Sequence, residues 1–368
     1  MKDNRRAFIR CQYVFPLLLV ACYSLLGLSG CATAPPPQTF DPAPVYPAPP
    51  DEPRYIYERT LQSNEDVERV TGFERLKILA TGRSPTVRGL VKPYGVAVYQ
   101  NRVYVTDTAQ HVVLLFDIPG QRFRQFGEDE PGKLLKPIGI AVSKQGEVFV
   151  ADATARRVLV FSAEGAYLRT LGSDELLQRP VGVAVSPDGA RVYVVDVGGI
   201  NNDNHRVQVF DPQSGAHLQT IGTRGEGKGQ FNLPLQAATG PDGTLYVVDG
   251  GNFRVEAFDA GGQFLFTFGE VGRFPGQFAR PKGIATDKDG NIYVVDTAFG
   301  NVQIFDKNGH VLMFIGNRDS ASKPGKFYLP AGVAVGEDGR VYMVDQYFRK
   351  VEIFKPLPVK TTEAAASH

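Results

Sequence analysis

The feature that most constrains the fold is a unit that recurs six times along the chain. Each copy opens with Pro-x-Gly, at Pro93, Pro137, Pro180, Pro281 and Pro330, with Pro234-Leu235-Gln236 as a variant. A second apolar run in each copy ends in an aspartate, at Asp107, Asp152, Asp196, Asp249, Asp296 and Asp345. Successive aspartates lie 44 to 53 residues apart. A period of about 40 to 50 residues with four short β-rich runs indicates the blades of a β-propeller.

The runs within each copy are typical of short strands. They hold four to six Val, Ile, Tyr and Phe residues and are bounded by Gly or Asp-Gly turns, such as Asp289-Gly290. Helical periodicity is absent from the repeats, and Gly (40) and Pro (26) are abundant, which disfavours an all-helical chain. With three Cys and no Trp, a disulfide scaffold and a tryptophan-defined repeat are excluded. We therefore predict an all-β, six-bladed propeller over residues 93–358, with four antiparallel strands per blade.

The repeats resemble a known family, the NHL repeats. The resemblance rests on Pro234 to Asp259 and Pro281 to Asp306, and on the lead-ins Gly229-Gln230-Phe231 and Gly276-Gln277-Phe278. It covers about seven-tenths of the chain and implies the six-bladed fold. It implies little about function, because this fold hosts many functions.

The first thirty residues have the layout of a secretory signal, with a basic start and a short apolar run. The run ends in Leu28-Ser29-Gly30-Cys31, which resembles the lipobox of bacterial lipoproteins. That resemblance implies cleavage before Cys31 and lipidation of its thiol, and Ala32 then favours the outer membrane. The alternative is an ordinary secreted protein with a chance cysteine. Residues 31–53 are rich in proline and are expected to form an extended tether; a docking site for a proline-reading domain is the alternative.

The sixth copy lacks a fourth strand, so we expect the ring to be closed by a strand from the N-terminal side. Within residues 54–92, the segment 55–61 is the candidate, followed by a short helix that Ser63 with Asp66 caps and Gly82 ends. A rival interpretation makes Leu76 to Leu79 the closing strand. Residues 359–368 are predicted to be a disordered tail.

Candidate binding residues gather on one side of such a ring. The turns after each second strand and the loops entering each Pro-x-Gly share one face, called here the loop face, and the short turns share the opposite turn face. Aromatic and Arg side chains on the loop face suit recognition of another protein, although a solvated rim would look similar. The candidates are His111, Arg156, Asn202, Asp203, His205, Gln236, Phe253, Arg254, Phe299, Tyr347 and Arg349.

The six aspartates are interpreted as structural, because a residue that recurs in every blade is best explained by a structural requirement that all blades share. We expect them to accept hydrogen bonds from the backbone or from a nearby arginine; the arginines proposed are Arg157, Arg206, Arg254 and Arg349.

The sequence contains no motif that specifically indicates a catalytic site. His111 and His205 alone make a poor zinc site, and no metal site or cofactor is predicted; Ca²⁺ in the loop around Asp203 is a minor alternative. Removing the signal takes the formal charge from +1 to about −2, and with secretion this argues against nucleic acid as a partner. We expect a monomeric, lipid-anchored outer-membrane lipoprotein that binds a protein or cell-envelope polymer without catalysing a reaction. A binding scaffold is favoured over an enzyme. The alternative is a metal-dependent lyase or lactonase with its site at the channel mouth.

Overall fold

The computed structural model describes residues 42–69, 71–82, 86–198 and 204–358. Outside these residues lie the predicted signal segment, residues 31–41 of the predicted tether (Cys31 included), Asn202, Asp203 and the tail at 359–368. In the described part of the chain, no helix has both the length and the apolar character needed to cross a membrane.

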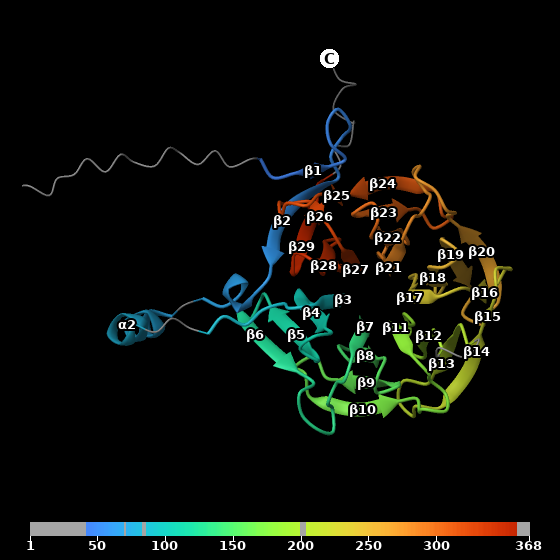
Figure 1. The fold of residues 1–368 in the computed structure, drawn as a ribbon, viewed down its shortest axis with the longest axis horizontal. Coiled ribbons are helices and arrows are strands. Elements are labelled where there is room, and N and C mark those ends of the chain that lie inside the picture. Colours follow the sequence, from blue (N-terminus) through green and yellow to red (C-terminus); the bar gives the residue numbers. More distant parts are fainter. Residues whose placement is uncertain (1–41, 70, 83–85, 199–203, 359–368) are drawn as a thin grey trace, which may run out of the picture. The chain divides into compact units, whose positions relative to one another are not determined.

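Six antiparallel sheets, five of four strands and one of five, are arranged in a ring, which confirms the predicted six-bladed propeller (Figure 1). Blade 1 is β3 (Pro93–Tyr99), β4 (Arg102–Asp107), β5 (Val112–Asp117) and β6 (Arg122–Phe126). Blade 2 is β7 (Pro137–Val142), β8 (Val148–Asp152), β9 (Arg157–Phe161) and β10 (Tyr167–Leu171). Blade 3 is β11 (Pro180–Val185), β12 (Val192–Asp196), β13 (Arg206–Phe210) and β14 (His217–Ile221).

The other three blades repeat this order, and two of them are preceded by short parallel ladders. Blade 4 is β17 (Pro234–Thr239), β18 (Leu245–Asp249), β19 (Arg254–Phe258) and β20 (Phe264–Phe268). Blade 5 is β21 (Pro281–Thr286), β22 (Ile292–Asp296), β23 (Asn301–Phe305) and β24 (Val311–Ile315). Blade 6 takes β27 (Pro330–Val335), β28 (Val341–Asp345) and β29 (Lys350–Pro356) from the C-terminal side. The ladders are β15 (Thr223–Arg224) with β16 (Gln230–Phe231), and β25 (Asn317–Arg318) with β26 (Lys326–Phe327).

The ring is closed as predicted, by β2 (Tyr55–Leu61) pairing antiparallel with β29. In Figure 1 the blue β2 lies beside the red β29. The Arg340 guanidinium holds this closure through both oxygens of Glu58, at 2.6 and 2.9 Å. Leu61 at the end of β2 is fully buried in the core.

The structure differs from the sequence prediction at the end of the tether. The compact unit begins at Ala43, and β1 (Val45–Tyr46) adds a fifth strand to blade 6 by pairing with β2. The Tyr46 ring packs edge-on against Phe354, with centroids 5.7 Å apart. The tether segment Val45–Tyr46 therefore belongs to the propeller, because packing an aromatic ring against the blade buries apolar surface that a free spacer would leave exposed.

The predicted helix is present but shorter, and the rival closing strand at Leu76 to Leu79 is wrong. α2 (Gly72–Thr81) is followed directly by Gly82, whose φ of 65° favours glycine. The predicted cap instead serves a separate 3₁₀ turn, η1 (Asn64–Asp66), where the Ser63 amide donates to the Asp66 carboxylate at 2.8 Å.

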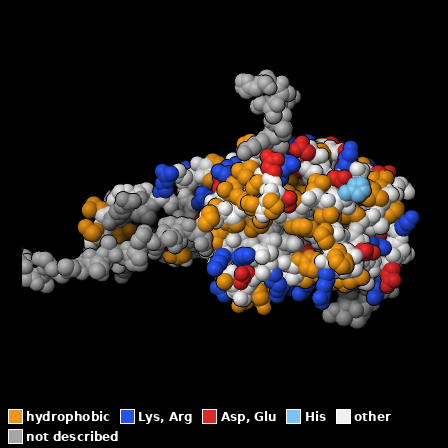
Figure 2. Space-filling model, turned by 90° about the horizontal axis from the view of Figure 1, so that it is seen from above, with side chains coloured by type: hydrophobic (Ala, Val, Ile, Leu, Met, Phe, Trp, Pro, Cys, Tyr) orange, Lys and Arg blue, Asp and Glu red, His pale blue; other side chains and the backbone are white. Residues whose placement is uncertain are grey.

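The core lies between blades rather than in one central mass. Both faces of the second strands are buried, which explains their nearly unbroken apolar runs. The outer strands of blades 2 to 5 each carry an exposed leucine at a register shift: Leu168, Leu218, Leu265 and Leu312. Such bulges hinder edge-to-edge pairing. Figure 2, a view of the rim, shows hydrophobic side chains mixed with charged ones.

Candidate functional site

The register of the blades places the candidate residues on a common face. In all six blades the proline that starts the first strand pairs with the aspartate that ends the second, as in Pro93 with Asp107 and Pro281 with Asp296. The entering loops and the turns after each second strand therefore meet at the same end of the ring. This end is the predicted loop face.

The six aspartates have the structural role predicted for them. All six are fully buried. Asp152 is representative: it accepts from the backbone amides of Leu135 (2.6 Å), Lys136 (2.9 Å), Thr154 (3.0 Å) and Ala155 (2.8 Å). Each aspartate thus joins the loop entering its blade to the turn that follows its own strand.

The arginine partners are correct in two blades and wrong in two. Arg206 reaches Asp196 at 3.4 Å, and Arg254 reaches Asp249 at 3.2 Å. Arg157 instead forms an ion pair with Asp174, at 3.7 Å. In blade 6 the register partner of Asp345 is Lys350, so Arg349 lies one residue before the equivalent strand position.

Arg254 is engaged within the chain rather than presented to a partner. Besides Asp249, its guanidinium donates to the carbonyls of Glu226 (2.8 Å), Gly227 (2.7 Å) and Gln230 (3.0 Å) and pairs with Glu256 at 2.6 Å. It holds the loop that enters blade 4, and its predicted role in binding a partner gains no support from this geometry.

Four other candidates occupy one structural position, the last residue before a third strand. His111, Arg156, Phe253 and Arg349 have φ between 54° and 60°, and Gly300 takes this place in blade 5. A non-glycine residue there costs about 1 kcal/mol. Arg156 and Arg349 are exposed, whereas Phe253 is half-buried. The structure thus spaces these side chains around the loop face without bringing them into one cluster.

The two histidines of the enzyme alternative each bind the loop entering the next blade. The His111 Nδ1 atom contacts the carbonyl of Leu135. The His205 Nδ1 atom accepts from the amide of Leu233 at 3.1 Å. Within the described ranges, no three His, Cys, Asp or Glu side chains are arranged to hold a metal ion.

Aromatic side chains cluster on the loop face where blade 6 meets blade 5. The Tyr347 ring lies 4.6 Å from Tyr328 and 5.2 Å from Phe348, and its side chain is 56% exposed. The Arg318 guanidinium covers the Tyr328 ring at 4.5 Å. We call Tyr328, Tyr347, Phe348 and Arg318 the blade-6 aromatic cluster.

Two further candidates border this cluster, one on each side. Arg318 donates to the carbonyl of Thr297 at 3.2 Å, in the turn that carries the half-buried Phe299. The exposed Arg349 follows Phe348 directly. Sequence reasoning found Tyr347, Arg349 and Phe299 but missed Tyr328 and Arg318, which lie in the loop between blades 5 and 6.

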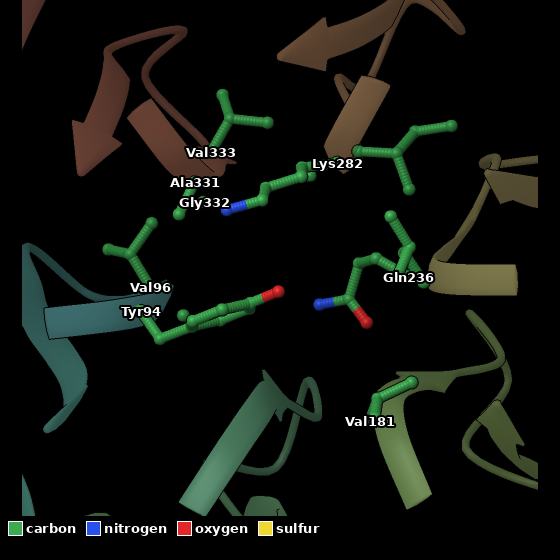
Figure 3. Close-up of a pocket in the computed structure, with 12 residues that line it drawn as sticks. Tyr94, Val96, Val181, Gln236, Lys282, Ala331, Gly332 and Val333 are labelled. Carbon is green, nitrogen blue, oxygen red and sulfur yellow. The ribbon is translucent and has the colours of Figure 1, made fainter. Parts of the chain in front are cut away.

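A second feature is a small, open pocket at the loop-face end of the channel. Its polar side chains are Tyr94, Gln236 and Lys282, from the first strands of blades 1, 4 and 5. Figure 3 shows the Tyr94 hydroxyl and the Gln236 amide facing one another while Lys282 reaches across from its own blade. The Lys282 Nζ atom lies 5.4 Å from the centroid of the Tyr94 ring.

The glycine of Pro-x-Gly sets the width of this end of the channel. A Cβ atom on Gly95 would lie 2.6 Å from the carbonyl oxygen of Ile138, and one on Gly332 equally close to that of Tyr94. Neighbouring first strands therefore approach closely only where this glycine is kept. Gln236 replaces it in blade 4, and its Oε1 atom accepts from the amide of Val183 at 3.1 Å.

Burial shifts the pKa values of both ionisable groups in the pocket. Desolvation, together with the nearby charge of Arg280, lowers the pKa of Lys282 to about 8. Desolvation raises the pKa of the Tyr94 hydroxyl, which Arg280 partly offsets. At neutral pH the pocket therefore presents an ammonium group and a phenol, both able to donate hydrogen bonds.

Sequence reasoning identified Gln236 but missed Tyr94 and Lys282. The signal was the middle residue of Pro-x-Gly, which is apolar in the other four blades: Ile138, Val181, Leu235 and Ala331. A polar residue at this position, which faces the channel, indicates a role other than apolar packing.

Comparison with known proteins agrees with this architecture. The NHL repeat family matches residues 177–210 and 278–305. No curated protein sequence matches the chain.

Similar solved structures include proteins of different activities. A protein of unknown function from Bacteroides thetaiotaomicron is 20% identical over 73% of this chain and 70% of its own, with a TM-score of 0.57. A gluconolactonase from Xanthomonas campestris is 18% identical over 82% and 98%, with a TM-score of 0.55. A virginiamycin B lyase from Staphylococcus aureus is 15% identical over 74% and 86%, with a TM-score of 0.51.

At such identities these structures share the fold with this chain and nothing more specific. The chain is therefore a six-bladed β-propeller that contains NHL repeats, matched at residues 177–210 and 278–305.

Proposed function

We propose that the chain is a lipoprotein anchored in a bacterial outer membrane through Cys31, and that its propeller binds a partner through the loop face without catalysis. The partner is a protein or a cell-envelope polymer. The observation that supports this proposal is the blade-6 aromatic cluster, where rings and guanidinium groups reach solvent side by side.

The chemistry of the cluster suits an interface. Tyr and Arg are the residues that dominate binding hot spots, because they combine a large apolar area with polar atoms. Tyr347 is largely exposed, whereas Arg318 is already oriented by its contacts with Tyr328 and Thr297. Side chains fixed in advance lose little conformational entropy when a partner binds. A partner seated on Tyr347 would also meet the exposed Arg349.

Photo-crosslinking in intact cells tests the proposal. A crosslinking amino acid replaces Tyr347 in the full-length chain, and a control replaces Lys288, which is exposed on the turn face of blade 5. The proposal predicts a discrete adduct from position 347 that position 288 does not give. The same adducts from both positions, or none from position 347, would contradict it.

The alternative of a metal-dependent lyase or lactonase needs ligands that converge on the channel mouth. His111 and His205 instead each bind the backbone of the loop entering the next blade. The gluconolactonase and the lyase of similar fold carry activities that 15–18% identity does not transfer. No feature of the described residues favours the enzyme over the binding platform.

A further inference from the structure

The helix α2 presents an apolar face to solvent. Leu76, Leu79 and Ala80 have the i, i+3, i+4 spacing that places residues on one side of an α-helix. Leu76 and Leu79 are 63% and 87% exposed, and Ala80 is exposed as well. The exposed Lys77 lies at the border of this face. Among its described side chains, α2 thus has an amphipathic pattern whose apolar side is left out of the propeller core.

A helix of this length is stabilised mainly by what covers its apolar face. α2 has ten residues, whereas isolated helices shorter than about 12 to 15 residues are marginal in water. Most helices in proteins owe their stability to the packing of an amphipathic face. Because this chain leaves Leu76 and Leu79 exposed, a surface outside the chain is needed to cover them.

The apolar face is small for an interface with another protein. A specific protein–protein interface buries about 800 Å² on each partner, and two leucines with one alanine supply only a fraction of that area. A second copy of this chain would meet the same limit. A contact this small suffices when the chain is already held beside the surface that it binds, because the effective concentration is then high.

The lipid anchor of the proposed function supplies such a surface, and the inference rests on it. The compact unit begins at Ala43, which follows Cys31 by 12 residues. A connection of this length spans at most about 40 Å when fully extended. A lipid on Cys31 would therefore keep the unit that contains α2 close to a bilayer.

The charge around α2 fits an anionic lipid surface. Residues 71–87 hold three basic residues and one acidic residue: Arg75, Lys77, Arg83 and Glu74. This positive excess lies in a chain whose formal charge is about −2 after removal of the signal. The stem of Lys77 can lie along the apolar layer while its ammonium group reaches the lipid phosphates. Leucines flanked by basic residues are typical of helices that lie in a membrane interface.

We propose that α2 lies in the interface of the membrane that holds the lipid anchor, with Leu76, Leu79 and Ala80 among the acyl chains and Lys77 at anionic headgroups. The helix is then a second contact between the chain and the bilayer, and it restricts the orientation of the tethered propeller. The contact is weaker than a lipid anchor, so a chain without lipid is released when cells are disrupted and diluted. Its binding is measurable at about millimolar lipid.

A single tryptophan tests the position of α2, because the chain contains no Trp. Leu79→Trp is introduced into the purified full chain that also carries Cys31→Ser and therefore has no lipid. The control is Leu168→Trp, on the outer strand of blade 2. Vesicles of phosphatidylglycerol should shift the emission of Leu79→Trp to shorter wavelength, and brominated lipid should quench it. The control should show neither change.

Sedimentation of the Cys31→Ser chain with the same vesicles separates the apolar and electrostatic contributions. Leu76→Ala with Leu79→Ala keeps the helix propensity and should weaken binding by about 10-fold or more. The matched control, Leu168→Ala with Leu218→Ala, should leave binding unchanged. Lys77→Gln should weaken binding to phosphatidylglycerol by about 5-fold.

Three results would overturn the proposal. A shift of the Leu79→Trp emission that grows with protein concentration in the absence of vesicles would show that a second copy covers the helix. The absence of a shift with vesicles would exclude the bilayer as the occupant. Equal shifts from Leu79→Trp and Leu168→Trp would show adsorption without a role for α2. Every chain in this test lacks the lipid, so its outcome is independent of whether Cys31 is acylated, which fractionation of cells tests separately.

Discussion

Replacing Lys282 by methionine should make the free protein more stable. Lys282 is held in the pocket without an acidic partner, and burial lowers the pKa of its ammonium group from 10.5 to about 8. Methionine has a similar length and keeps the contact with the Tyr94 ring, but carries no charge to desolvate. The change removes an unfavourable term from the folded state while leaving the packing of the pocket in place.

The expected size follows from the pKa. A fall from 10.5 to about 8 corresponds to about 3 kcal/mol of unfavourable free energy for the charged lysine in the folded state at pH 7. Lys282→Met should therefore raise the free energy of unfolding by up to about 3 kcal/mol at pH 7 and the thermal midpoint by a few degrees.

The gain should depend on pH in a defined direction. In the unfolded chain the lysine keeps its proton until about pH 10.5, whereas the folded protein releases it near pH 8. The wild-type chain therefore gains stability as the pH rises from about 8 to 10.5, and the advantage of Lys282→Met disappears over the same interval. Other titrating groups, including the buried tyrosines, act equally in both proteins and cancel in the difference.

The assay is urea unfolding of wild type, Lys282→Met and Lys288→Met at pH 7 and pH 10. Lys288 is an exposed lysine of the same blade, so its replacement should change stability by no more than about 0.5 kcal/mol. A Lys282→Met protein that is less stable than wild type at pH 7, or that keeps its advantage at pH 10, would refute the reasoning.

Three further predictions concern the closure, a buried carboxyl group and the anchor. Deleting residues 54–62 removes β2 and should lower the thermal midpoint sharply. Glu58→Ala removes only the ion pair with Arg340 and should lower the free energy of unfolding by about 1 kcal/mol or less. An unchanged thermal midpoint after the deletion would contradict closure of the ring by β2. Burial raises the pKa of Glu256 to about 7, so the free energy of unfolding should fall as the pH rises from about 4.5 to 7. Urea unfolding of Glu256→Gln should show a smaller fall over the same pH range. A fall as large as that of the wild type would exclude this carboxyl group as the cause. Cys31→Ser should move the chain from the membrane to the soluble fraction of disrupted cells, and a chain still held in the membrane fraction would contradict the proposed lipid anchor.

The blades were predictable because every blade solves the same packing problem. Pro-x-Gly is needed where neighbouring first strands approach closely, and the aspartate is needed to join the entering loop to the next turn. Because each blade has the same local requirements, the same residues recur in each repeat. The period, the strand count and the structural role of Asp152 could therefore be predicted from the sequence. The closing strand at 55–61 followed from the strand that blade 6 lacks.

The parts that were missed depend on contacts between distant segments. Nothing near Tyr46 in the sequence indicates that its ring will pack on Phe354. Lys282 and Tyr94 are far apart in the chain and meet only because the ring closes. The blade-6 register was misread because Arg349 and Lys350 are both basic, and only the pairing of Asp345 with Lys350 distinguishes them.

Metal analysis of the purified full chain tests most directly the claim that the propeller binds rather than catalyses. We predict that zinc, manganese and iron are all well below one equivalent, and that His111→Ala with His205→Ala changes neither metal content nor loop-face crosslinking. One equivalent of a transition metal that this double variant loses would contradict a binding role without catalysis and establish a metal centre at the channel mouth.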